Sequence, residues 1–473
     1  MEKIKQILKP DKMLAFFIII CPILDMSSFL FRNKFNTNYS ISTFIRPIIP
    51  AIIFVYLFFK KKNKVNVVVI CFIYLIYAVI HLFLYKNMMA KCSFGTVIHE
   101  AQYLVNYSFM ILNLYIFKNV YDDSNDNLLR KSIVISLAIY IISIYISIIT
   151  ETSSTTYIEG IGIKGWFESG NSISAILVLS TFIVMSFIMK IENKVNRMIT
   201  FVILILVGVY LVTLIGTRVG LIGFVLAVLC FIIAQFYEKI VTNVKINKKN
   251  LIILLTILVL LTIIVVTAGS VTLRRRSHLR NMENTIIDQS TGEVSHLTGD
   301  LTVIKNKIIN NELEEDFMTE AQKKSILDLY NIAEKQNVKS TDSRKQQMIY
   351  HCILVKNQKN IILILFGNGY LINTNELVWE MEFPAFALNF GLIGFVLFML
   401  PFIINLIKCI KVLIKNTKNV DTEAIMLLCA VILSFVLSTL SGYTFFNSSS
   451  MIIIIVSNVL ISNKIKTIKV GLD

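Results

Sequence analysis

LIILLTILVLLTIIVVTAG at residues 251–269, followed at once by SVTLRRRSHLR at 270–280, is the junction from which the fold can be predicted. The first part is an almost entirely apolar run, close to the roughly 20 residues that a helix needs to cross a bilayer. The second part carries four arginines and opens a polar stretch that continues to Phe383. No other polar segment is nearly as long, so the chain divides into membrane-length runs and one large loop.

The composition supports this division. Of the 473 residues, 55% are hydrophobic and only 16% are charged, which excludes an ordinary soluble domain. The alternating pattern of a membrane barrel is absent, so helices are the structure that satisfies the backbone in lipid. The first run contains Asp25 and lacks a small-residue cleavage site, so we expect a retained helix rather than a signal peptide. We predict an all-α polytopic membrane protein with about twelve transmembrane helices: 13–31, 41–59, 65–85, 96–117, 132–150, 171–189, 198–215, 218–237, 251–269, 384–407, 424–441 and 447–462.

Lysine and arginine are distributed unevenly between the two sides that twelve spans define. With the N-terminus inside, the inner segments hold 25 of these residues and the short outer loops hold five. Because positive charge accumulates on the cytoplasmic side of membrane proteins, this asymmetry predicts cytoplasmic termini and a long loop outside the cell. The same placement argues against nucleic acid as the reason for the net charge of +16.

The long loop is expected to be mostly helical. Recurring apolar positions in 301–337 predict helices against the outer membrane face, with a helix start at Thr319 and Gln322 at the capping-box position. A second helix is expected over 344–356, and the glycines of 367–370 predict a turn. The topology gives three parts: 1–269 with nine spans, the extracytoplasmic loop domain 270–383 between spans nine and ten, and 384–473 with three spans.

Several arginines lie at the level of the outer membrane surface, where positive charge is disfavoured. Arg46 lies near the outer end of the second span, and Arg218 begins the eighth span between glycines. Arg274, Arg275 and Arg276 directly follow the ninth span. Because guanidinium groups pair bidentately with phosphate, these residues predict a site for an anionic lipid such as a diphosphate. The alternative is that they reach ordinary phospholipid headgroups.

Acidic residues stand at the other end of the loop. Glu380 and Glu382 directly precede the tenth span. A carboxylate at this boundary can take a proton from a sugar hydroxyl, which makes both residues candidates for a general base. The alternative is that they are solvated acids favoured by a helix N-terminus.

The fourth predicted span carries a polar face. His99, Gln102, Asn106 and Asn113 lie on one side of it, and Glu100 is adjacent. Polar residues of this kind in a membrane helix either join helices or line a wet cavity.

No metal site can be predicted from the sequence. The five histidines are scattered, and no motif has metal-ligand spacing. Of the seven cysteines, Cys92 and Cys352 lie outside the predicted spans on the outer side, and they are either bridged or free.

Five short motifs follow one another from the sixth span to the tenth. They are Ser169-Gly170-Asn171, Gly216-Thr217-Arg218-Val219-Gly220, Asp342-Ser343-Arg344, Phe366-Gly367-Asn368-Gly369, and Glu380-Met381-Glu382 followed by Gly391-Leu392-Ile393-Gly394. In this order, and with a large loop after nine spans, they resemble the Wzy/WaaL family of O-antigen polymerases and ligases, particularly the capsule and exopolysaccharide polymerases of Gram-positive bacteria. Ligases of the family often carry a His-Asn pair where Glu380 and Met381 stand, so a carboxylate replaces histidine as the expected base.

The resemblance implies a glycosyltransferase in the cytoplasmic membrane that polymerises polyprenyl-diphosphate-linked oligosaccharide repeat units at its outer face. It implies that Arg218 and Arg344 bind the diphosphate, with Arg274–Arg276 and Arg46 as further candidates, and that Glu382 or Glu380 is the base. It implies no cofactor and no metal. The expected partners are the lipid-linked oligosaccharide, membrane lipid, and a chain-length regulator and flippase of the same pathway.

Two other functions stay open on the sequence alone. A ligase of the same family would transfer glycan to a wall polymer or lipid, and the motifs do not separate it from a polymerase. A lipid-linked oligosaccharide flippase also fits twelve spans and an anionic-lipid site, although no inverted repeat is evident and a flippase rarely needs so large an outward segment.

Overall fold

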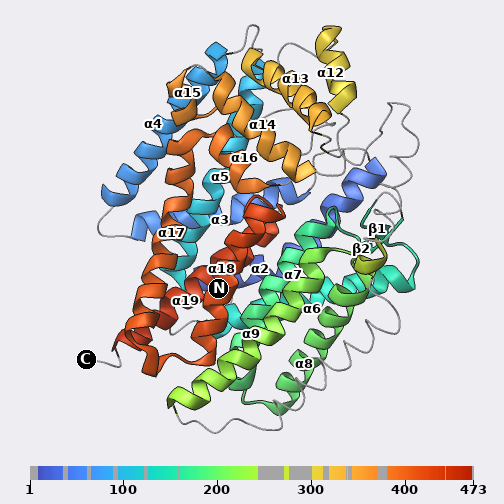
Figure 1. The fold of residues 1–473 in the computed structure, drawn as a ribbon. Coiled ribbons are helices and arrows are strands. Elements are labelled where there is room, and N and C mark those ends of the chain that lie inside the picture. Colours follow the sequence, from blue (N-terminus) through green and yellow to red (C-terminus); the bar gives the residue numbers. More distant parts are fainter. Residues whose placement is uncertain are drawn as a thin grey trace.

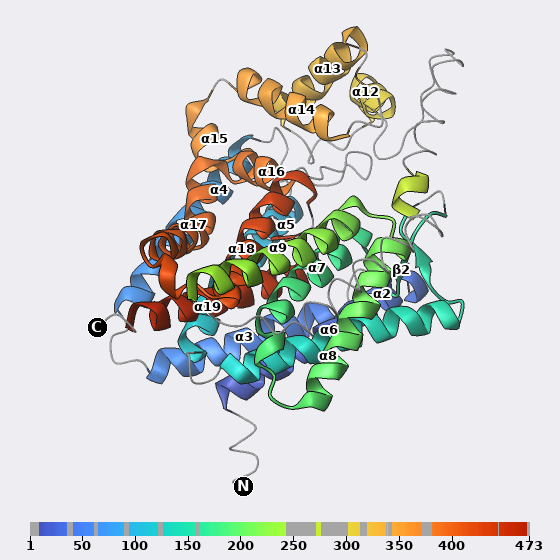
Figure 2. The same ribbon diagram turned by 60° about the horizontal axis from the view of Figure 1, so that its bottom comes forward.

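Long helices packed side by side make up most of the protein (Figures 1 and 2). The computed structural model describes residues 9–35, 41–60, 65–88, 94–121, 126–157, 160–242, 271–275, 301–312, 319–336, 338, 343–358, 360–369, 381–442 and 444–470. The bundle helices are α2 (Pro10–Phe35), α3 (Ile41–Lys60), α4 (Val65–Met88), α5 (Phe94–Val120), α6 (Asp126–Ile149), α7 (Gly170–Phe187), α8 (Lys194–Val209), α9 (Arg218–Thr242), α17 (Gly391–Lys415), α18 (Thr422–Leu440) and α19 (Ser448–Val470).

Shorter elements complete the described chain. They are the antiparallel strands β1 (Ser154–Thr155) and β2 (Ile163–Gly165), the 3-10 helices η1 (Ile188–Lys190) and η5 (Thr417–Asn419), the π-helix η2 (Tyr210–Leu214), and the helices α12 (Leu301–Ile309), α13 (Glu320–Lys335), α14 (Ser343–Asn357), α15 (Ile361–Phe366) and α16 (Glu382–Asn389). The hairpin of β1 and β2 was not predicted and departs from an all-helical chain.

Nine of the described helices are long and apolar enough to cross a membrane. They coincide with nine of the twelve predicted spans, and the protein is a multi-pass membrane protein whose membrane-spanning part is helical. α3 and α5 cover two further predicted spans without being among the nine. The predicted span 251–269 lies outside the described residues.

The tenth predicted span begins at Gly391, not at residue 384, because a backbone contact separates α16 from α17. Gly391 has φ +70°, and an added Cβ would lie 2.3 Å from the Leu365 carbonyl oxygen. Gly367 has φ +101°, and an added Cβ there would lie 2.1 Å from the Asn389 carbonyl oxygen, to which the Gly369 N–H donates at 2.9 Å. Glycine is therefore required on both sides of this contact, as the predicted turn at 367–370 implies for Gly367 and Gly369.

The core is centred on α7, which packs against α6, α9, α18 and α19 (Figure 1). The span that contains it is 94% buried inside the protein. The hydroxyl groups on α7 form hydrogen bonds within the helix: those of Ser174 and Thr181 donate to backbone carbonyl oxygens one turn earlier. Such small residues let neighbouring helices approach closely.

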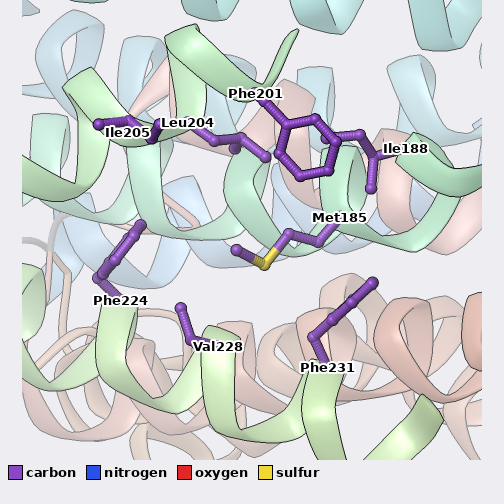
Figure 3. A pocket seen from close by; sticks show the side chains of 8 residues that line it. All are labelled: Met185, Ile188, Phe201, Leu204, Ile205, Phe224, Val228 and Phe231. Carbon is purple, nitrogen blue, oxygen red and sulfur yellow. The ribbon is translucent and has the colours of Figure 1, made fainter. Parts of the chain in front are cut away.

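A cavity of about 10 Å³ remains between α7, α8 and α9 (Figure 3). The side chains around it are all apolar, including Met185, Phe201 and Phe231. A volume of this size holds about one water molecule at most, and water needs polar partners. The cavity is a packing gap and has no room for a glycan.

The helices of the long loop lie together at one end of the bundle, which we call the loop end (Figure 1). Thr319 caps α13 and Gln322 completes the predicted capping box. α13 packs on α14 through a small apolar cluster that includes Ile326 and Leu354. The prediction of α14 is confirmed, whereas the predicted helical stretch 301–337 is divided into α12 and α13.

The opposite end of the bundle, which we call the far end, is closed by ion pairs. Arg130 of α6 contacts Glu423 at 2.5 Å, and Lys464 of α19 contacts Asp421 at 2.7 Å. Lys190 contacts both acids, lying 3.1 Å from Asp421. The first turn of α18 is thereby tied to the ends of three other elements.

Candidate functional site

The turn before α9 presents Arg218 to solvent. The π-helix η2 ends the preceding span, and Gly216 reverses the chain with φ +79°. Thr217 then caps α9, because its Oγ1 accepts a hydrogen bond from the Gly220 N–H at 3.1 Å. Arg218, the first residue of α9, is exposed, and no ion pair joins it to a described carboxylate.

The Ser169-Gly170-Asn171 motif lies against this turn. Ser169 caps α7, and the hydroxyl of Ser174 on α7 is 2.6 Å from the hydroxyl of Thr217. From the hairpin, Thr156 donates to the Ile215 carbonyl oxygen at 2.8 Å. Two motifs that are separated in the sequence are therefore joined in space.

Residues 271–275 lie against the same turn. Thr272 donates to the Thr217 carbonyl oxygen at 3.4 Å, and an added Cβ on Gly216 would lie 3.2 Å from Val271. The Arg275 guanidinium stacks over the Tyr157 ring, 3.2 Å from its centroid. The structure thus brings Arg218 together with the segment of Arg274 and Arg275, and we call these three residues the arginine corner. Arg276 lies outside the described residues.

Arg46 is paired inside the bundle. Its guanidinium lies 2.5 Å from Asp25 and 2.9 Å from the Ser449 hydroxyl, and it also donates to Ser448. Asp25 accepts a second hydrogen bond from the Tyr140 hydroxyl at 2.5 Å. The charge of Arg46 is thus compensated by a carboxylate that the sequence did not identify as its partner.

Glu382 holds the turn between α18 and α19. Its carboxylate accepts hydrogen bonds from the N–H groups of Thr444 at 2.6 Å, Phe445 at 2.9 Å and Phe446 at 3.2 Å. The residue is only 6% exposed. Burial raises the pKa of Glu382 to about 7, although the three N–H groups favour the charged form and oppose this shift. Glu380, the other predicted base, lies outside the described residues.

Arg344 lies in the first turn of α14, close to the element that carries Glu382. One turn later, Gln347 forms two hydrogen bonds of 2.8 Å with the backbone of Met381, one to the N–H and one to the carbonyl oxygen. Met381 directly precedes Glu382. Arg344 is exposed, and α14, which carries it, packs against α16, which carries Glu382.

The segment 444–450 links several of these residues. Glu382 binds its beginning, and Arg46 binds the serines at its end. Asn447 caps α19, because its side-chain oxygen accepts hydrogen bonds from two N–H groups of the first turn. The sequence signal for this segment is a cluster of polar residues, Thr444 and Asn447 to Ser450, at the start of an apolar run.

The polar face predicted on the fourth span is divided: His99, Gln102 and Asn106 are exposed on α5, whereas Asn113 is buried and its Nδ2 donates to the Phe109 carbonyl oxygen. The adjacent Glu100 is also buried and lies 2.8 Å from Nε2 of His81 on α4. Nδ1 of His81 in turn lies 2.6 Å from the Phe366 carbonyl oxygen, so this pair ties α4 and α5 to the glycine turn.

Among the described residues, no group of three His, Cys, Asp or Glu side chains is arranged to hold a metal ion. Cys352 is free and exposed, and its possible partner Cys92 lies outside the described residues.

Comparison with known proteins identifies the family. No curated protein matches the chain. The model of one family, described as O-antigen ligase like membrane protein, matches residues 9–467. This match covers nearly the whole chain, including the arginine corner, Arg344 and Glu382. The protein therefore belongs to the family of O-antigen ligase-like membrane proteins.

Proposed function

We propose that this protein is a polysaccharide polymerase that joins polyprenyl-diphosphate-linked oligosaccharide repeat units at the outer face of the cytoplasmic membrane. The family implies glycosyltransferase-type activity with lipid-linked glycans. The observation that carries the proposal is the arginine corner, where Arg218 is exposed beside a second arginine-bearing segment. In this proposal both termini are cytoplasmic and the loop end faces outward.

The proposed reaction places growing negative charge on the leaving group. An acceptor hydroxyl attacks the anomeric carbon of the donor, the bond from that carbon to the diphosphate oxygen breaks, and the diphosphate leaves with the bonding electrons. A preplaced cation lowers this barrier, and removing such a group costs roughly 10²–10³ in rate. Arg218 suits this role because it is exposed and lies at the N-terminus of α9, where the helix dipole also favours an anion.

The proton of the acceptor hydroxyl goes to Glu382 in this proposal. A base works best when its pKa is near the working pH, and the pKa of Glu382 is raised to about 7. Oε2 accepts the Phe445 N–H, Oε1 accepts two backbone N–H groups, and the Ser438 side chain also hydrogen-bonds to the carboxylate. Arg344 on the adjoining helix is assigned to the diphosphate.

Arg46 is assigned a positioning role. It already pairs with Asp25 and two serine hydroxyls, so binding a diphosphate would require these contacts to break. We propose that it orders the start of α19, next to the turn that Glu382 holds.

The test is to incubate the purified protein with lipid-linked repeat units and to separate the products by size. A polymerase gives a ladder. A single transfer to another acceptor would indicate a ligase, and translocation without a new glycosidic bond would indicate a flippase.

Two variants test the residue assignments in the same assay. Arg218→Ala and Arg344→Ala should each lower the rate roughly 100-fold or more. Arg197→Ala is the control, because Arg197 lies in the first turn of α8, at the opposite end of that span from the turn that carries Arg218. Wild-type ladders from both test variants would disprove the assignments.

A further inference from the structure

Gln347 of α14 holds the residue that directly precedes the proposed base. Its side chain is 0% exposed, and its amide meets both backbone groups of Met381: Oε1 accepts the N–H and Nε2 donates to the carbonyl oxygen, each at 2.8 Å. A single hydrogen bond would let this backbone pivot, whereas two fix its orientation as well as its position. The Cα atoms of Met381 and Glu382 are only about 3.8 Å apart, so whatever fixes the first residue constrains the second.

The start of α16 depends on this contact. Met381 is the N-cap residue of α16 and makes no capping hydrogen bond through its side chain. In a capping box, a Glu or Gln at the third helical position accepts the N–H of the N-cap residue. That position of α16 is Pro384, which has no side-chain acceptor. Gln347 supplies the missing acceptor from another helix, and Glu382 is the first residue of the helix that it anchors.

Glu382 is thereby held at both ends. Its carboxylate accepts N–H groups of residues 444–446 at 2.6 to 3.2 Å, and its backbone follows the residue that Gln347 fixes. A shift of about 1 Å would take these hydrogen bonds out of their normal range. Reacting groups need positions within about 0.5 Å, so the contact with Gln347 is suited to keep this carboxyl group in place.

The same helix carries Arg344. It lies three residues before Gln347, and residues three apart are neighbours on a helix surface. α14 packs against α16 at the loop end (Figure 1). The position of α14 therefore determines how far the arginine assigned to the diphosphate lies from the proposed base.

We propose that Gln347 is a positioning residue, which holds Glu382 where it can take the proton of the acceptor hydroxyl. The inference rests on the proposed function, because that proposal makes Glu382 the base. Gln347 acts through the backbone of Met381, to which both of its hydrogen bonds go.

Gln322 of α13 is a matched control. It is 1% exposed, and its amide also bonds to backbone at both ends: Oε1 accepts the Thr319 N–H at 2.8 Å and Nε2 donates to the Asn368 carbonyl oxygen at 3.4 Å. α13 packs on α14, so Gln322→Met and Gln347→Met remove the same kind of contact from the same pair of helices. Of the two residues, Gln347 is the one that contacts Met381.

The first experiment does not depend on the reaction. Burial and hydrogen bonds determine the raised pKa of Glu382, with no charged side chain among the causes, so the difference in thermal midpoint between pH 5 and pH 8 reports its position. Gln347→Met should lose roughly half of this difference or more, because a released carboxylate can reach water and regain its usual pKa. Gln322→Met should keep it. The full difference in Gln347→Met, or an equal loss in Gln322→Met, would overturn the proposal.

The second experiment measures the rate of ladder formation. Gln347→Met should lower kcat roughly 100-fold and leave the KM for the lipid-linked donor unchanged, because a displaced base slows chemistry and not binding. Combined with Glu382→Gln, it should cause no further loss, since the group that it positions is already gone. An additional loss of the same size in the double variant would overturn the proposal.

Two further comparisons keep the outcomes distinct. A wild-type rate in Glu382→Gln alone would disprove the assignment of the base, and the first experiment would still decide whether Gln347 holds this carboxyl group. If Gln347→Met does not fold, Gln347→Asn is compared with Gln322→Asn in both experiments. The shorter amide of asparagine can keep one of the two hydrogen bonds, so the effects of Gln347→Asn should have the same direction and be smaller.

Discussion

The two ends of the helix bundle treat basic side chains differently. At the far end, Arg130, Lys190 and Lys464 share the carboxylates of Asp421 and Glu423. At the loop end, Arg218 is exposed, and no ion pair joins it to a described carboxylate. A paired cation stabilises the fold, but an added anion must compete with its partner. An exposed, uncompensated cation can accept an anion at little cost, which is why we place the diphosphate at the loop end.

Unlike Arg218, Arg46 is paired with a carboxylate, and its removal should have the largest effect on stability. Arg46→Ala leaves Asp25 without its cation. Both side chains are 17% exposed, so we expect a cost near the lower end of the roughly 3–5 kcal/mol that breaking a fully buried pair costs. The measurement is the free energy of unfolding in mixed micelles. The double variant Arg46→Ala/Asp25→Asn should recover much of the loss, because no charge is then left uncompensated. Additive losses in the double variant would show that the pair does not act as a unit.

The pH dependence of stability tests the comparison at Glu382. Backbone hydrogen bonds hold this carboxylate, and no described cation contacts it. Its folded-state pKa of about 7 exceeds the usual value of 4.5, so the folded state binds the extra proton between these values. Stability from this group is therefore greatest below pH 4.5 and is lost as the pH rises to about 7. The full change is about 3 kcal/mol.

The measurement for Glu382 is the thermal midpoint at pH 5 and pH 8. The wild-type midpoint should be higher at pH 5, and Glu382→Gln should lack this difference. The same pH dependence in both proteins would place the titrating group elsewhere.

Arg218→Lys tests whether the exposed arginine binds the anion through its fork geometry. Lysine keeps the charge but loses the second parallel hydrogen bond, worth about 1.5–3 kcal/mol for a charged group. The rate of ladder formation should fall roughly 10-fold to 100-fold while the unfolding midpoint stays unchanged. An unchanged rate would mean that charge alone is sufficient at this position.

Lys190→Ala should have the smallest effect. Lys190 is half exposed, and Glu423 keeps Arg130 as a partner in its absence. Exposed ion pairs contribute roughly 0.2–1 kcal/mol. A loss of several kcal/mol on unfolding would contradict the view that the far end shares its charges among several partners.

Local patterns predicted the helices and their caps well. The capping box at Thr319, the helix α14 and the glycine turn depend on neighbouring residues, so the sequence alone predicts them. The pairing of Arg46 with Asp25, Ser448 and Ser449 could not be predicted, because these residues lie on three separate helices. The β1–β2 hairpin could not be predicted because its strands are very short: β1 and β2 contain five residues in total.

In the candidate site too, the identity of single residues could be predicted from the sequence, whereas contacts between distant segments could not. The position at a membrane boundary identified Arg218 and Arg274–Arg276 as candidates, and the family resemblance identified Arg344. Only the structure shows that the contact of Thr272 with Thr217 brings Arg218 and the segment 271–275 together. The burial of Glu382 was also not foreseen, because the N–H groups that hold it come from residues more than sixty positions later. Polar residues inside apolar runs, such as Asp25 and Thr444, were the available signal.

The burial of α7 has a consequence for biogenesis. α18 and α19, which cover much of it, are synthesised more than two hundred residues later. At about 5–20 residues per second, α7 waits on the order of ten seconds or more in lipid before these partners exist. Because α7 is strongly apolar, it is stable in contact with lipid during this interval, although it is almost completely buried in the folded protein. The apolar character of α7 therefore serves the nascent chain during insertion as much as the packed core.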